Sequence, residues 1–174
     1  MNCEIITDRF EIEKLAEDIF ISSSKKGLMS LDYADLRITR RRGAFKIALS
    51  FKVEMLTANW TQRLIELIKS HIIPVDKLNT ILVYFFVDGV GGSMISHKDA
   101  TEILCFVNEY IREEAEQRSD EYVDLVWAVY MDNSLPKNCF QATLMFSYAK
   151  TPQDELEDKQ YQQMIEEYRQ QFLY

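Results

Sequence analysis

The apolar run Ile81–Val87 limits the fold of this 174-residue chain more than any other stretch of its sequence. Nearly every side chain in the run is aliphatic or aromatic, so the usual alternation of polar and apolar residues is absent. Such runs are typical of a strand that is buried on both faces, and strands of this kind are mostly parallel and central in a sheet. We therefore build the predicted fold around this strand.

Helical and strand-like patterns alternate along the rest of the chain. Apolar spacing and end signals predict four helices before the tail, over 8–26, 30–42, 58–72 and 96–118. Further strands are predicted over 45–51, 123–131 and 140–148, the last returning antiparallel beside the one before it. We expect an α/β fold in residues 1–150: a single two-layer domain whose mainly parallel four-stranded sheet carries an antiparallel edge strand.

Residues 151–174 form a second segment of different composition. The chain turns polar and acidic at Thr151, and a helical apolar stripe follows. We predict an acidic linker and then an amphipathic helix, which either docks on the domain or contacts another copy or a partner. The candidate contact residues are Tyr161, Met164, Ile165, Tyr168 and Phe172.

Charge and cysteine content exclude several classes of function. The net charge of −8 argues against a nucleic-acid surface, and the glutamates of the tail argue against an anionic membrane. Cys3, Cys105 and Cys139 have neither disulfide nor metal-ligand spacing, which favours a reducing compartment. Neither a signal peptide nor an apolar run of membrane-spanning length is visible. We therefore expect a cytoplasmic protein without a metal site.

The segment from Gly27 to Arg37, called the 27–37 segment below, carries the main candidate site. Gly27 ends one helical pattern, Ser30 is placed to cap the next helix, and Asp32 and Asp35 fall in its first turn. Their spacing of three puts both carboxylates on one face, where they could hold a cation or polarise one water. Ordinary helix-start chemistry accounts for the same pattern without any chemical role.

The sequence Gly-Leu-Met-Ser-Leu-Asp-Tyr-Ala-Asp-Leu-Arg of this segment resembles the synergy loop of FtsZ, the bacterial tubulin homologue. In that family the usual form is Gly-Leu-Ile/Met-Asn-Val/Leu-Asp-Phe-Ala-Asp-Val-Arg. Weaker likeness extends over 8–149, through Gly43-Ala-Phe-Lys-Ile-Ala and the predicted strands after it. The resemblance is to the FtsZ C-terminal domain alone, with 8–26 resembling the end of the interdomain helix. The Gly-Gly-Gly-Thr-Gly loop of the GTP-binding domain is absent from the sequence.

The resemblance implies a role for specific residues. In FtsZ the synergy loop enters the nucleotide site of the neighbouring subunit, and its two aspartates help to activate water. By resemblance, Asp32 and Asp35 would act catalytically in trans, with Ser30 standing where the family usually has Asn. The implied partner-binding residues are Gly27, Leu28, Ser30, Asp32, Asp35 and Arg37.

The expected function follows from this resemblance. It implies an FtsZ-like interaction module that caps or modulates the polymer of an FtsZ/tubulin-like GTPase, or that associates with itself. The chain alone would bind no cofactor, because GTP would lie on the partner domain. The alternatives are the C-terminal half of a GTPase completed at a subunit interface and a small-molecule-binding domain on the same scaffold.

Overall fold

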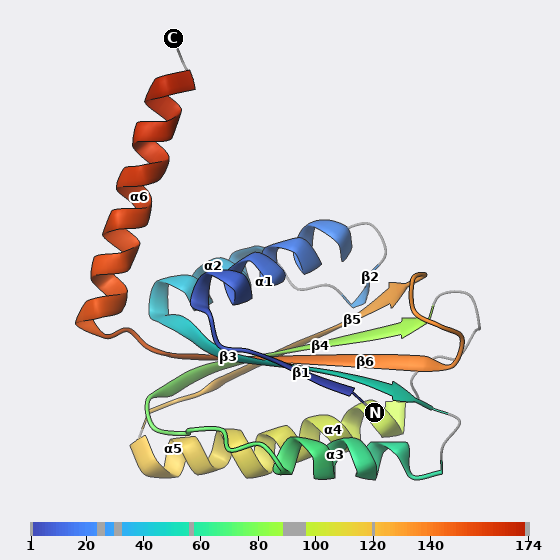
Figure 1. Cartoon of the computed structure of the whole chain (residues 1–174). Helices are drawn as coiled ribbons and strands as arrows, with labels where there is room; N and C mark the ends of the chain where they lie inside the picture. The colour runs from blue at the N-terminus through green and yellow to red at the C-terminus, as the bar shows by residue number, and fades with distance from the viewer. Residues whose placement is uncertain are drawn as a thin grey trace.

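The computed structural model describes residues 2–23, 27–29, 33–55, 58–88, 97–119 and 121–172. In these residues one sheet lies between two layers of helices, and a long helix projects from the body (Figure 1). The elements in chain order are β1 Asn2–Ile6, α1 Arg9–Ser23, β2 Gly27–Met29, α2 Tyr33–Arg42, β3 Gly43–Glu54, α3 Trp60–Lys69, β4 Leu78–Asp88, α4 His97–Val107, the π-helical turn η1 Asn108–Arg112, α5 Glu113–Ser119, β5 Asp124–Asp132, β6 Cys139–Ala149 and α6 Pro152–Phe172.

Strand β4 is the buried central strand that the apolar run predicts. All of its residues from Leu78 to Asp88 are buried. It pairs in parallel with β5 on one side and antiparallel with β6 on the other. The six-stranded order is β1-β3-β6-β4-β5-β2. The predicted α/β class and the buried strand are confirmed.

The predicted sheet topology is wrong. Among the described strands only β4 and β5 run parallel, so the sheet is mixed rather than mainly parallel. Strand β6 is not an edge strand beside β5; it lies between β3 and β4 and is antiparallel to both. Its residues Ala142–Tyr148 are all buried, as in β4, and an apolar run carries no information about strand direction. The two edges are formed by β1 and β2, which were not predicted as strands.

The domain has three layers rather than the predicted two, because helices cover both faces of the sheet (Figure 1). Helices α1 and α2 cover one face, where Ile12, Ala16 and Leu36 pack on the sheet. Helices α3, α4 and α5 cover the other face with Leu64, Ile103 and Ala115. Helices α1 to α5 lie close to the predicted helical spans, because burial of one face decides both the spacing of apolar residues and the packing of the helix.

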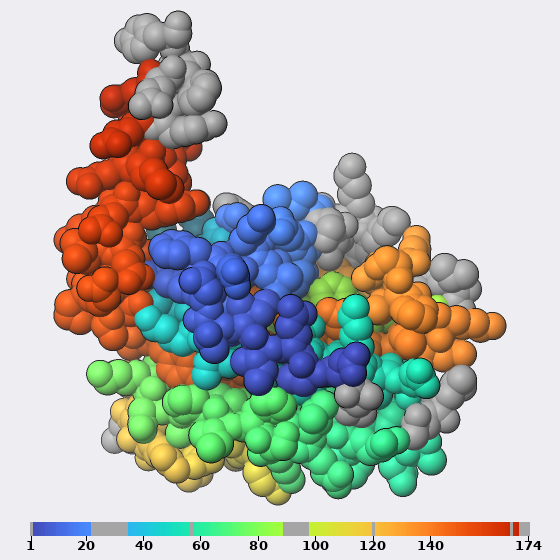
Figure 2. Space-filling view, viewed as in Figure 1, coloured from blue at the N-terminus to red at the C-terminus, as the bar shows by residue number. Residues whose placement is uncertain are grey.

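Helix α6 starts earlier than the composition of the tail suggests. Pro152 is its first residue, so the acidic stretch that the sequence predicts as a linker forms the first turns of the helix. Beyond these turns α6 stands clear of the compact body (Figures 1 and 2). A helix is therefore present in the tail, and most of its length extends away from the domain.

Candidate functional site

The start of the 27–37 segment lies at an edge of the sheet. Gly27–Met29 forms the edge strand β2, whose residues Gly27 and Met29 pair with Tyr130 and Val129 near the carboxyl end of β5. Sequence reasoning predicts only a helix stop at Gly27, because three residues are too few to give a strand pattern. The pairing places the start of this segment beside the carboxyl end of β5.

Helix α2 carries the second half of the segment. Asp35 lies in its first turn and is half-buried, whereas Arg37 is exposed. Leu36 is buried against the sheet, and the Thr39 hydroxyl donates a hydrogen bond to the Asp35 carbonyl oxygen at 2.9 Å. Burial of Leu36 therefore fixes the start of α2 on the sheet, while Arg37 remains exposed to solvent.

Several of the predicted site residues cannot be placed. Ser30 and Asp32 lie outside the described residues, and only the backbone of Leu28 is described. The expected approach of Asp32 to Asp35, and the capping role of Ser30, therefore stay predictions.

Arginines at the end of α2 fix the helix to its neighbours. Arg40 forms an ion pair with Glu17 of α1 at 2.6 Å and donates a second hydrogen bond to the Glu13 carbonyl oxygen at 3.1 Å. Arg42 forms an ion pair with Asp124 of β5. Sequence analysis cannot find these pairs, because the partners are more than 20 residues away in the chain. They hold α2 in one orientation above the sheet.

Two aspartates end the parallel strands side by side. Asp88 and Asp132 are opposite each other in the register of β4 and β5. The Asp88 carboxylate is 3% exposed and accepts the backbone N–H of Asn138 at 2.7 Å. Asp132 accepts the backbone N–H and the hydroxyl of Ser134 at 2.8 and 2.6 Å. Both carboxylates thus stabilise the turn that follows β5.

Metal-binding geometry is absent from the part of the chain that the structure describes. No group of three or more His, Cys, Asp or Glu side chains there could hold a metal ion. The Sγ atom of Cys3 lies 3.5 Å from Nε2 of His71, although the two residues are far apart in the sequence. Burial raises the pKa of the Cys3 thiol, with a further contribution from Glu4, which favours the neutral thiol over the thiolate.

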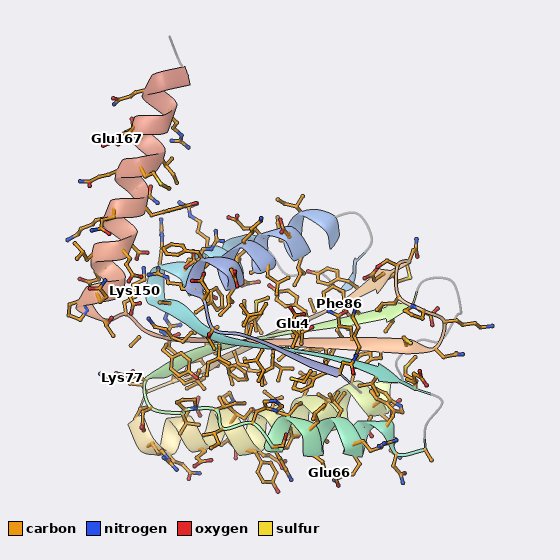
Figure 3. The ribbon with its side chains drawn as sticks, viewed as in Figure 1. Glu4, Glu66, Lys77, Phe86, Lys150 and Glu167 are labelled. Carbon is orange, nitrogen blue, oxygen red and sulfur yellow. The ribbon has the colours of Figure 1, made fainter. Side chains whose placement is uncertain are left out.

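A groove under α1 was not predicted from the sequence. Its volume is about 390 Å³, and apolar side chains of Leu15, Ile19 and Phe86 line it together with the carboxylates of Glu4, Asp18 and Asp132. Figure 3 labels Glu4 and Phe86, which reach this groove from β1 and β4. The residues that line the groove come from six different elements, and no local pattern in the sequence unites them.

The base of α6 is joined to the body by an ion-pair cluster around Arg9. The guanidinium of Arg9, 8% exposed, pairs with Glu13 at 3.0 Å and with Asp158, and donates to the Asp154 carbonyl oxygen at 3.2 Å. Lys46 pairs with the Asp154 carboxylate. Burial alone would lower the pKa of Arg9, but the carboxylates of Glu13 and Asp158 outweigh burial and raise it. Arg9 therefore stays charged at the centre of the cluster.

The predicted stripe of α6 contacts the body through Tyr161. Tyr161 packs on Phe10 of α1 with ring centroids 5.5 Å apart, and it remains 43% exposed. Met164 is 56% exposed and Ile165 is half-buried. The side chains of Tyr168 and Phe172 are not among the described ones. The first turns of α6 thus dock on the body of the same chain.

Comparisons with known proteins give matches of fold only. No protein-family model matches the chain, and no curated protein matches it. Within the described residues, none of the helices is both long enough and apolar enough to cross a membrane.

Solved structures similar to this chain include an empty FtsZ dimer from M. jannaschii, with 16% identity and a TM-score of 0.49 over 77% of this chain and 38% of that chain. Another is TubZ of Bacillus thuringiensis serovar israelensis in GDP-form protofilaments, with 14% identity and a TM-score of 0.40 over 72% of this chain and 33% of that chain. The chain thus spans well under half of either protein. Since both identities are below 25% and both TM-scores are below 0.5, what the chain does has to follow from its own residues.

Proposed function

We propose that this chain is an interaction module that docks its 27–37 segment on the nucleotide face of an FtsZ- or tubulin-like GTPase and thereby caps or modulates its polymer. The observation that supports this most directly is the position of the segment at the sheet edge. Its backbone begins in β2, and the exposed Arg37 follows in α2. The described ends of the eleven-residue segment that resembles the FtsZ synergy loop, Gly27–Met29 and Asp35–Arg37, thus lie in the edge strand β2 and at the start of α2.

The surroundings of α2 suit such a contact. Buried Leu36 and the ion pairs of Arg40 and Arg42 restrict the helix, so little conformational freedom would be lost when a partner binds its first turn. The exposed guanidinium of Arg37 could donate paired hydrogen bonds to a phosphate or carboxylate of the partner. GTP would belong to the partner, and Asp32 and Asp35 would lie near its nucleotide.

A closely related alternative is half of a GTPase, whose hydrolysis site is completed at a subunit interface. The two versions predict opposite changes in the rate of GTP turnover. A capping module lowers GTP turnover by removing polymer ends, whereas a completing half raises turnover by supplying the aspartates that orient water.

The test is to titrate this protein into an assembling FtsZ and to measure GTP hydrolysis and pelleted polymer together. Asp35→Ala removes one proposed contact carboxylate. Its matched control is Glu66→Ala on α3, an exposed carboxylate on the other face of the sheet, which Figure 3 labels. We expect the wild type and the control to change turnover alike and Asp35→Ala to act at least threefold more weakly. Unchanged turnover and polymer at tenfold excess of the wild type would overturn the proposal.

The groove under α1 favours a second candidate, a small-molecule site for an amine with an apolar body. Its floor of Leu15, Ile19 and Phe86 suits a hydrocarbon chain. Its carboxylates form no ion pair with any lysine or arginine of the described part of the chain, which suits a cationic head.

Octylamine is a suitable probe for this groove, with octanol as the uncharged control. We expect octylamine to shift the backbone amide resonances of Phe86 and Asp132. Asp18→Asn should weaken the binding of octylamine severalfold and leave the binding of octanol unchanged. Equal shifts from the amine and the alcohol would exclude recognition of the charge.

A further inference from the structure

One face of helix α6 makes its contact with the body. Asp154, Asp158 and Tyr161 follow one another at intervals of four and three residues, and they therefore lie on the same side of the helix. Asp154 is 2% exposed, Asp158 meets Arg9, and Tyr161 packs on Phe10. This side of the helix is thus the face by which α6 docks on α1.

The same face continues along the helix beyond the body. Tyr161 is followed at intervals of four, three and four residues by Ile165, Tyr168 and Phe172, and we call these four residues the α6 seam. Figures 1 and 2 show that α6 leaves the body after its first turns and extends into open space. The body therefore supplies a partner for the start of this face, whereas Ile165, the next residue along it, remains partly exposed.

We propose that the α6 seam pairs antiparallel with the α6 seam of a second copy of this chain. Intervals of four and three are those of the a and d positions of a coiled coil, in which such side chains interlock between two helices. The seam continues an existing contact face, so a second helix can extend the packing that α1 begins. This contact is separate from the 27–37 segment and does not depend on the function proposed above.

The distribution of charge on α6 favours a second copy as the occupant. The helix is acidic, with six carboxylates against one lysine and one arginine. Four of the carboxylates lie in the first two turns, and the other two, Glu166 and Glu167, lie at the b and c positions, away from the seam. The positions flanking the seam are Gln162, Met164, Arg169 and Gln171. Antiparallel pairing thus brings no two like charges together, despite the acidity of the helix.

The size of the contact predicts its strength. If each of the four seam side chains buries about 100 Å², roughly half of what a large side chain can bury, the pair of helices covers about 800 Å² in total. That area is below the range of stable interfaces and is typical of weak, reversible association. We therefore expect dimerisation that depends on concentration rather than a permanent dimer.

Sedimentation equilibrium of the intact chain between about 5 and 500 μM tests this, a range set by the weak association that such an area implies. Ile165→Asp introduces a charge into the seam, and Gln163→Asp introduces the same charge at an exposed position on the opposite side of α6. We expect the average mass of the wild type and of Gln163→Asp to rise toward that of a dimer, and Ile165→Asp to dimerise at least tenfold more weakly. Circular dichroism checks that both variants keep α6 helical.

The orientation has its own test. In an antiparallel pair centred on the seam, position 165 of one copy meets position 168 of the other. Mixing Ile165→Asp with Tyr168→Lys should therefore restore the dimerisation that each substitution alone weakens. A wild type that remains monomeric at the highest concentration, or dimers that Ile165→Asp leaves intact, would show the proposal to be wrong. Asp35→Ala should dimerise like the wild type, which separates this contact from the 27–37 segment.

Discussion

The Asp154 carboxylate accepts two hydrogen bonds from Thr151, one from its backbone N–H at 2.8 Å and one from its hydroxyl at 2.7 Å. The Thr151 hydroxyl accepts the Asp154 N–H in return, at 3.2 Å. This reciprocal pattern is a capping box, with Asp where Glu is more usual, and Pro152 between the two residues suits the first helical position. The base of α6 is thus fixed locally by Thr151 and over a long range by Lys46.

Asp154→Asn should loosen the base of α6. The amide cannot replace a buried charge that pairs with Lys46, so we expect a loss of about 1–2 kcal/mol in the free energy of unfolding. Hydrogen exchange should also become faster in the first turns of α6. Glu155→Gln changes an exposed neighbour on the same turn and should stay within about 0.5 kcal/mol of the wild type. Equal losses in both variants would contradict a specific role of Asp154.

The stability that Asp154 contributes should depend on pH. Burial alone would raise the pKa of Asp154, but hydrogen bonds from Lys46 and Thr151 outweigh burial and lower it from 3.8 to about 2. A carboxyl group with a lowered pKa in the folded state stabilises the protein above its unfolded pKa, and this contribution disappears as the pH falls through the folded pKa. The difference in stability between the wild type and Asp154→Asn should therefore be full above about pH 4 and vanish toward pH 2. Urea unfolding of both proteins at several pH values measures it, and a constant difference over that range would argue against the pairing.

Arg9→Gln should release α6 without unfolding the sheet. The variant leaves the carboxylates of Glu13 and Asp158 without their shared cation. Because Arg9 is buried and both carboxylates are partly buried, removing the cation leaves charges that water screens only in part. We expect amide protection in α6 to fall at least tenfold while protection in β4 and β6 changes little. Lys14→Gln, an exposed cation on the same helix, is the control and should leave α6 protected.

Gly43→Ala should destabilise the junction between α2 and β3. A Cβ atom at this position would lie 2.7 Å from both the Tyr148 carbonyl oxygen and Asn79 Nδ2, and it would also overlap Ser147 Oγ. Since one of these neighbours is backbone in the middle of the sheet, relief requires strand movement, and a cost of about 2–3 kcal/mol is expected. Chemical denaturation of Gly43→Ala alone and together with Ser147→Ala tests this. The double variant should recover only part of the loss, because the carbonyl clash remains.

Local patterns were sufficient to predict most elements of this fold. The run around Phe85 predicts a strand buried on both faces, and the stripes of α1 and α3 predict their spans within a few residues, since burial creates both pattern and structure. The T-P-Q-D sequence at 151–154 also carries a helix-start signal, so the true start of α6 could have been found.

What could not be predicted depends on contacts between distant residues. The insertion of β6 between β3 and β4 rests on pairings such as Leu49 with Leu144, which the apolar pattern of either strand permits but does not specify. Edge strand β1 is short and mostly exposed, which leaves little periodicity to detect. The groove under α1 and the Arg9 cluster likewise join residues of several elements. For the candidate site, the sequence places Asp35 and Arg37 on α2 but gives no sign that Gly27 begins a strand.

The position of β6 also has a consequence for the order in which the chain is made. A growing polypeptide that has reached Leu135 already contains β3 and β4. The strand that lies between them in the sheet, β6, has not yet been made, so each of them still has one unpaired edge. The sheet can close only when nearly all of the body has left the ribosome, and its central pairings join residues about a hundred positions apart. Until then two apolar strand edges are available to other molecules, so synthesis of this protein should be the stage at which aggregation threatens it most and at which a chaperone helps it most.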